Sequence, residues 1–254
     1  MRLVLGFAVI GMACRGEAER VVSRPSAGDG AAPVALADAP PPPAIAIDAA
    51  APLEAPAITI VDAPMKWSAE RERLTLEYRR LHSDPAATDL AIDPRVIVLH
   101  YTGGSSAKGT RGYFDNTRIE ASRPQLARAG AVNVSSHYVI DRDGTIYRLQ
   151  PETRFARHCI GLNHLAIGIE NAGDEDRWPL TDAQVAANIA LVRDLVRRYP
   201  KLTHLLGHHE VMGFRRHPYY VERDPSYVND KPDPGAAFMK KVRAGLVDVA
   251  LSGP

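Results

Sequence analysis

The 254-residue chain has little of what marks several specialised classes of protein. Its 31 lysines and arginines nearly balance its 30 aspartates and glutamates, which leaves a formal net charge of +1. Without an excess of either sign, the composition gives no reason to expect a nucleic acid as partner. The sequence contains no internal repeat. With 45% hydrophobic and 24% charged residues, it fits one globular catalytic domain and an additional segment.

Cysteine is nearly absent, since the chain has only Cys14 and Cys159. If Cys14 carries a lipid, no intramolecular disulfide can form, and the core alone must stabilise the fold. A lone cysteine is most often a buried packing residue, and we expect this role for Cys159.

The chain also lacks the spacing His-Glu-x-x-His, with which many zinc peptidases hold their metal on a helix. The nearest approach is Gly207-His208-His209-Glu210, which has no second histidine at helical spacing. This excludes a zinc peptidase of that type.

Residues 1–14 place one positive charge before an apolar run that is too short to span a bilayer. We expect them to be an export signal. Gly11 and Ala13 before Cys14 resemble a bacterial lipoprotein signal, in which Cys14 becomes the lipidated first residue. The alternative is ordinary secretory cleavage near Ala13. The expected location is therefore the periplasm, with Cys14 as the only membrane anchor, or else the medium as a secreted protein.

Residues 15–66 are dominated by alanine and proline, without helical or strand periodicity. Such a segment buries too little apolar surface to fold, so we expect a disordered linker there. Its proline content favours an extended spacer, although a simple tail has the same composition. The domain itself is expected over residues 67–250.

Strand and helix patterns alternate within this domain. Arg95–His100 is apolar on both pleat faces, as in a strand inside a sheet. Thr181 and Gln184 have the spacing of a capping box at the start of a helix. The alternation predicts an α/β fold with a mixed central sheet flanked by helices. We expect helices starting near Ser68, Thr181 and Ala236, and strands over 95–100, 134–140, 145–149, 166–170 and 202–208.

Histidines end two of the expected strands. His100 follows Val96 and Val98 on one pleat face, and His208 follows Leu202 and Leu206. A neutral imidazole there can bind zinc through one nitrogen while the other is held by an acceptor. A histidine at a strand end is otherwise commonly structural, so the surrounding motifs decide. If the strand is regular, His209 points away from His208.

These motifs resemble the N-acetylmuramoyl-L-alanine amidase family, which includes bacterial recycling amidases, phage zinc amidases and peptidoglycan recognition proteins. The resemblance spans about residues 95–235, and the pieces occur in the order of the family. They are Val98–Thr102, Ser136–Gly144, Arg157-His158 with Gly161, Ile167–Glu170, Gly207–Glu210 and Lys231-Pro232-Asp233-Pro234-Gly235.

The resemblance implies a Zn²⁺ held by His100, His208 and Asp233, with one coordination position left open for catalysis. It gives Glu170 the role of general base and Lys231 that of stabilising the developing oxyanion. Pro232 stands where the family usually has Thr or Ser. The implied reaction is hydrolysis of the amide between the N-acetylmuramic acid lactyl group and L-alanine in peptidoglycan or muropeptides. A non-catalytic peptidoglycan-binding module of the same fold is the alternative.

The third ligand has rivals, because the interval from His208 to Asp233 is longer than in compact recycling amidases. Asp224 and His217 lie within it but outside a Lys-x-Asp-Pro-Gly context. The inserted residues 213–229 either line the substrate groove, through Arg215, Arg216, Tyr219 and Tyr220, or form a lid or packed surface loop; we favour the latter.

Two further histidines belong to the motifs without being expected ligands. His137 is expected to support the zinc site or the core. His158 either contacts substrate or supports a ligand, and a histidine that only bonds to its neighbours fits the same pattern.

Overall fold

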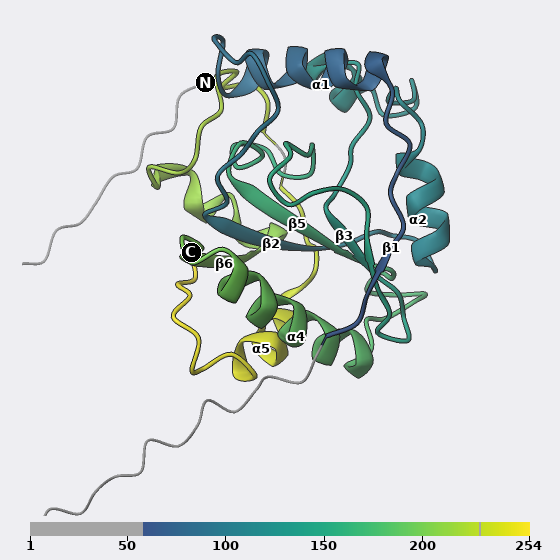
Figure 1. The fold of residues 1–254 in the computed structure, drawn as a ribbon, viewed down its shortest axis with the longest axis vertical. Coiled ribbons are helices and arrows are strands. Elements are labelled where there is room, and N and C mark those ends of the chain that lie inside the picture. Colours follow the sequence, from purple (N-terminus) through teal and green to yellow (C-terminus); the bar gives the residue numbers. More distant parts are fainter. Residues whose placement is uncertain (1–57, 229) are drawn as a thin grey trace, which may run out of the picture. The chain divides into compact units, whose positions relative to one another are not determined.

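Strand β2 (Val96–Tyr101) lies in a six-stranded mixed sheet with helices packed against it, which confirms the predicted fold class (Figure 1). The computed structural model describes residues 58–228 and 230–254. Neighbouring strands are parallel, except that β3 and β4 form an antiparallel hairpin. In spatial order the strands are β1 (Ile60–Asp62), β4 (Ile146–Arg148), β3 (Tyr138–Ile140), β5 (Ala166–Asn171), β2 and β6 (His204–Gly207).

Helices α4 (Asp182–Arg198) and α5 (Ala236–Ala244) cover one face of the sheet, side by side (Figure 1). The predicted capping box is present, since the Thr181 and Gln184 side chains each accept the other's backbone N–H. Side chains of α4 and α5 pack on the sheet in the largest apolar cluster, where burying each large aliphatic side chain contributes about 1.5–3 kcal/mol. Members of this cluster include Ile97, Leu99, Ile167, Leu191, Leu195 and Val242.

The opposite face carries helices α1 to α3 and the loops that shape the site. Helix α1 (Ala69–His82) starts at Ser68, whose side chain accepts the N–H of Arg71 as the sequence predicts. Helix α2 (Ala107–Phe114) packs against β3, and α3 (Pro124–Ala129) follows it. Neither short helix was predicted. Buried Cys159 packs with Val96 and Val98 on this face, which confirms its expected role.

Several predicted boundaries were wrong. The linker was expected to reach residue 66, yet Ile60–Asp62 forms β1 on the sheet edge beside β4. Beyond residue 250, the N–H of Leu205 donates to the Ser252 carbonyl, so the domain extends past its predicted end. The expected strand 202–208 is only His204–Gly207, and Leu202 packs on the opposite face from Leu206. The predicted signal, Cys14 and most of the linker lie outside the described residues.

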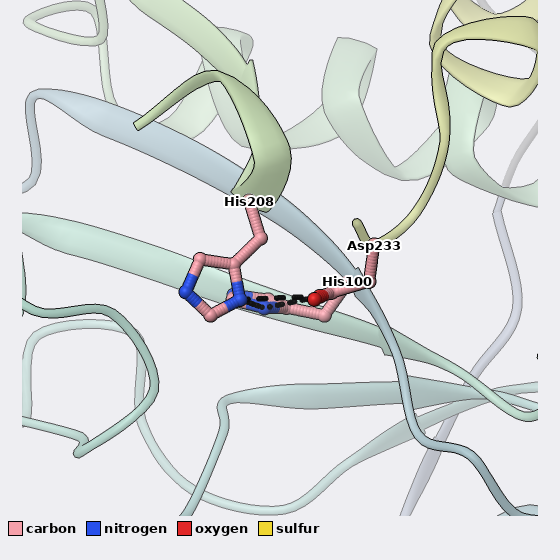
Figure 2. Close-up of side chains that lie close together, drawn as sticks. All are labelled: His100, His208 and Asp233. Atoms are coloured by element: carbon pink, nitrogen blue, oxygen red, sulfur yellow. Dashed lines mark hydrogen bonds and ion pairs between the residues drawn. The ribbon is translucent and has the colours of Figure 1, made fainter. Parts of the chain in front are cut away.

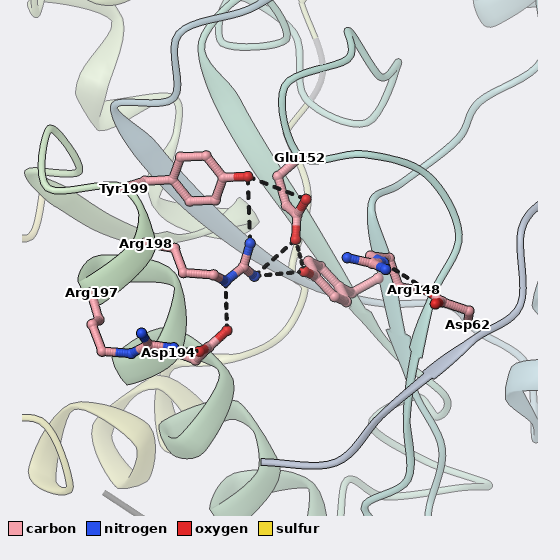
Figure 3. Close-up of polar contacts among 8 residues, drawn as sticks. Asp62, Arg148, Glu152, Asp194, Arg197, Arg198 and Tyr199 are labelled. Carbon is pink, nitrogen blue, oxygen red and sulfur yellow. Dashed lines mark hydrogen bonds and ion pairs between the residues drawn. The ribbon is translucent and has the colours of Figure 1, made fainter. Parts of the chain in front are cut away.

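A polar network fastens the end of α4 to the loop after β4 (Figure 3). The buried carboxylate of Glu152 accepts hydrogen bonds from the Tyr138 hydroxyl and, at 2.8 Å, from Arg198. Arg198 also pairs with Asp194 one turn earlier, at 2.8 Å.

Among the described residues, no helix has the length and apolar character to cross a membrane.

Candidate functional site

His100 and Glu170 lie at the carboxyl ends of two adjacent parallel strands. Strands β2 and β5 pair so that the Cα atoms of these two residues are register partners. Period-two alternation places His100 on the face of Val98 and Glu170 on the face of Gly168. The candidate site therefore lies at the carboxyl edge of the sheet, where α/β folds commonly bind ligands.

His208 reaches the site from a turn rather than from a strand. Strand β6 ends at Gly207, and a 3-10 helix, η1 (His208–Glu210), begins at once. The Glu210 carboxylate accepts the Gly207 N–H at 2.7 Å and two bonds from Arg243, and these contacts fasten the turn. The prediction that His208 continues the pleat was therefore wrong, although its side chain does reach His100.

The neighbouring His209 is not among the candidate ligands, as expected. Its backbone N–H donates to the Asp233 carbonyl at 2.8 Å, and its ring lies against Gly207 with Nδ1 3.3 Å from the same carbonyl oxygen. His209 thereby holds the backbone of Asp233 in place. Asp233 comes from the segment just before α5, far along the chain from both histidines.

Figure 2 shows His100, His208 and Asp233 converging on one point. The two Nδ1 atoms are 3.0 Å apart, and Oδ2 of Asp233 is 3.1 Å from each. Ligand bonds of about 2.0–2.1 Å in a tetrahedral zinc site separate the ligand atoms by about 3.3 Å. The triangle is thus close to one face of such a tetrahedron, and the donor set of two imidazoles and one carboxylate fits Zn²⁺.

The charge states also suit a divalent cation. Burial, together with repulsion from His208, lowers the pKa of His100 to about 4, so its ring is neutral at pH 7. Burial alone would raise the pKa of Asp233, but the two adjacent imidazoles outweigh it and hold this pKa far below its usual value. The site therefore offers neutral nitrogen and an ionised oxygen, as metal binding requires.

Glu170 has an unusual environment for a carboxylate. Burial raises its pKa to about 8, the charge of Asp233 adds to the rise, and Lys231 and Arg123 oppose it. Its Oε2 atom has no hydrogen-bond partner among the described residues. A carboxyl group with a free oxygen and a raised pKa beside a possible metal site is typical of a catalytic acid or base.

The three candidate ligands and Glu170 line a cleft of about 440 Å³. Lys231 lies on its wall with Asp233, as the two-residue spacing predicts. The sequence did not identify Tyr113, Arg123 or Tyr227, which also line it. Arg123 donates to the Tyr113 hydroxyl at 2.9 Å. No motif surrounds these residues, and the tyrosines that the sequence analysis named in the insertion were Tyr219 and Tyr220.

The rival ligands lie elsewhere. Asp224 accepts bonds from the Ser226 backbone and hydroxyl in a local turn, and the His217 ring stacks on Phe214. Most of the insertion 213–229 is a packed loop, as favoured from the sequence. The four side chains proposed as possible groove residues, Arg215, Arg216, Tyr219 and Tyr220, are not on the cleft wall.

The ring of His158 packs against that of His100, and the ring of His137 packs against that of His158. His137 is fully buried, accepts the Gly168 N–H at 2.9 Å and contacts the Arg154 carbonyl at 2.8 Å. Backbone groups thus occupy both of its ring nitrogens, and burial lowers its pKa to about 4. His158 is half-buried and contacts His100.

Comparison with known proteins gives a match to a family model. Residues 90–236 match the model described as N-acetylmuramoyl-L-alanine amidase. This range includes the candidate ligands His100, His208 and Asp233, and also Glu170 and Lys231.

Two relatives in sequence agree with this match. The chain is 28% identical over 139 residues to the 1,6-anhydro-N-acetylmuramyl-L-alanine amidase AmpD of Haemophilus influenzae, covering 49% of this chain and 74% of that protein. It is 30% identical over 101 residues to the endolysin of Escherichia phage T7, covering 38% and 66%. Among solved structures, the amidase endolysin LysCS from Clostridium intestinale superposes with a TM-score of 0.45 at 23% identity, covering 76% of this chain and 97% of that one.

Proposed function

Because the chain belongs to the N-acetylmuramoyl-L-alanine amidase family and is a peptidoglycan amidase, we propose that it uses Zn²⁺ to cleave the lactyl amide of peptidoglycan. The bond proposed joins the lactyl group of N-acetylmuramic acid to L-alanine of the stem peptide. The observation that carries the proposal is the convergence of His100, His208 and Asp233 on one point beside the free carboxyl of Glu170.

The three converging side chains would hold the metal and leave its cleft side open. When bound there, Zn²⁺ supplies Lewis-acid polarisation of the scissile carbonyl and acidifies water. In its ionised form, which the positive charge of a bound cation would favour, Glu170 has the free oxygen needed to take a proton from the attacking water and to pass it to the leaving amine. Lys231, on the same wall, provides a positive charge for the oxygen that becomes negative in the transition state.

A non-catalytic binding module of the same fold would need only the cleft. It would need neither three ligand atoms within 4.8 Å of one another nor a buried carboxyl oxygen, Oε2 of Glu170, that has no hydrogen-bond partner in the part of the chain that the structure describes. Both features support an enzyme over a binding module.

Digestion of purified sacculi tests the reaction and the bond together. We expect release of stem peptides whose new amino terminus is alanine, with the lactyl carboxylate left on the sugar. Chelation should stop the release, and added Zn²⁺ should restore it. Peptides that begin at another residue would refute the assigned bond, and no release by the zinc-loaded protein would refute the enzyme.

We further propose export and lipidation at Cys14, which rest on the sequence pattern of residues 1–14. The predicted linker would then carry the domain away from the membrane toward the cell wall. Labelling with a fatty-acid precursor in a bacterial host should mark the wild-type protein but not Cys14→Ala. A mature protein that is soluble and unlabelled would argue for ordinary secretion instead.

A further inference from the structure

His158 occupies the space between a metal-ligand candidate and the neighbouring strand. Its Nδ1 atom is 3.1 Å from Nε2 of His100, the ring nitrogen opposite the one that faces His208 and Asp233. Its own Nε2 is 3.2 Å from the Ala166 carbonyl oxygen of β5. The three groups form a chain that runs from the backbone to the proposed metal site.

The Ala166 carbonyl determines which atom donates in each of these hydrogen bonds. A carbonyl oxygen can only accept, so the Ala166 contact requires a proton on Nε2 of His158. A neutral His158 then has a bare Nδ1, which must accept from Nε2–H of His100. Neutral His100 in turn has its lone pair on Nδ1, the atom that faces the metal point.

Local packing holds the His158 ring in this position. A Cβ atom on Gly168 would lie 2.7 Å from Cγ of His158 and 2.8 Å from the Ser136 hydroxyl oxygen. The His158 ring therefore fills the space above Gly168. Any larger side chain at 168 must therefore displace the ring.

We propose that His158 is a positioning residue, which fixes the tautomer and ring orientation of His100 so that Nδ1 binds the metal. The inference rests on the proposed zinc site. Although His158 also lines the cleft, the two hydrogen bonds use both of its ring nitrogens, so its side chain has no polar atom left to bind substrate. This separates the two roles that the sequence left open.

Zinc affinity, measured by competition with a chelating indicator at fixed pH, tests the proposal without reference to activity. His158→Leu removes the acceptor, and we expect zinc affinity to fall about 10–100-fold. His158→Asn places a carbonyl oxygen near the position of Nδ1 and should restore most of the affinity. His164→Leu changes a half-buried histidine outside the cleft wall and should bind zinc normally.

Gly168→Ala tests the same inference without altering either histidine. The added methyl group must move the His158 ring, so zinc affinity should fall as it does in His158→Leu. Wild-type affinity in Gly168→Ala, or in a folded His158→Leu, would overturn the proposal. Equal loss in the Leu and Asn variants would overturn it too, because acceptance of the hydrogen bond would then be irrelevant.

Nitrogen NMR of the zinc-loaded wild-type protein requires no substitution. We expect His158 to be the Nε2–H tautomer and His100 to keep its proton on Nε2. A proton on Nδ1 of His158 would contradict the proposed hydrogen bonds from His100 to His158 and from His158 to Ala166. His100→Ala separates this inference from the proposed function: if that variant binds zinc like the wild type, the metal site itself is wrong, whereas loss there with full binding in His158→Leu refutes only the role of His158.

Discussion

His100 and Glu170 face each other across adjacent parallel strands as register partners. Neighbouring strands of a sheet lie about 4.8 Å apart, and this spacing is maintained by backbone hydrogen bonds. The proposed metal ligand and the proposed general base are therefore held by two paired strands that lie inside the sheet, each with a neighbour on both sides. A change of the Glu170 side chain can remove the base without disturbing the ligands.

The first prediction follows from this separation. Glu170→Gln keeps the shape of the side chain but cannot take a proton, so we expect the rate of stem-peptide release to fall about 10²–10⁴-fold. Zinc content, measured on the same preparation, should equal that of the wild type. Glu72→Gln, an exposed change on α1, is the matched control and should retain full activity. Loss of zinc in Glu170→Gln would place this carboxylate among the ligands.

The second prediction concerns the third ligand. Asp233→Ala removes the only carboxylate of the converging trio, so zinc should be lost during dialysis that the wild type withstands. Activity should disappear with the metal. Asp224→Ala and His217→Ala change the rival residues, which the structure places in a local turn and in an aromatic stack. Both should keep zinc, and a reversal of this pattern would reassign the ligand.

The elements that the sequence predicted well are those with local signals. β2 and β5 are short apolar runs, and α4 carries both a capping box and helical periodicity. Their ends place His100 and Glu170, so these two site residues could be found from strand patterns and motif order.

The missed features depend on contacts between distant segments. The turn that starts at His208 is held by Arg243 through Glu210, and β1 exists because β4 provides a partner. The packing of His158 over Gly168 joins two segments that no periodicity connects. Short-range patterns contain no information on such contacts. His208 could therefore be identified from its motif, whereas the turn that positions it could not be predicted.

A third prediction tests Lys231. Its positive charge lies on the cleft wall beside Asp233, where it can stabilise developing negative charge. Lys231→Met should lower kcat about 10²–10³-fold, since loss of one such donor costs about 3–4 kcal/mol in the transition state. Zinc binding should not change. Lys240→Met, exposed on α5, serves as the control, and a kcat for Lys231→Met equal to that of the wild type would exclude the proposed role.

The last prediction concerns stability and its dependence on pH. Burial alone would raise the pKa of Glu152, but hydrogen bonds from Tyr138 and Arg198 outweigh it and lower this pKa below its usual value. A carboxyl group with a depressed pKa stabilises the fold above its unfolded-state pKa of about 4.3, and this contribution is lost as pH falls through the folded pKa. Glu152→Gln should therefore lower the unfolding free energy by about 1.5–3 kcal/mol at pH 7.

Urea unfolding at pH 7 and at successively lower pH measures this effect. The difference between wild type and Glu152→Gln should shrink below about pH 4, because the wild-type carboxyl group becomes protonated there as well. Asp62→Asn removes the exposed partner of Arg148 (Figure 3) and should leave stability unchanged, since solvent screens such pairs. If the difference in unfolding free energy between wild type and Glu152→Gln were independent of pH, the substitution would act through packing. The charge on Glu152 would then not stabilise the contact between α4 and the loop after β4.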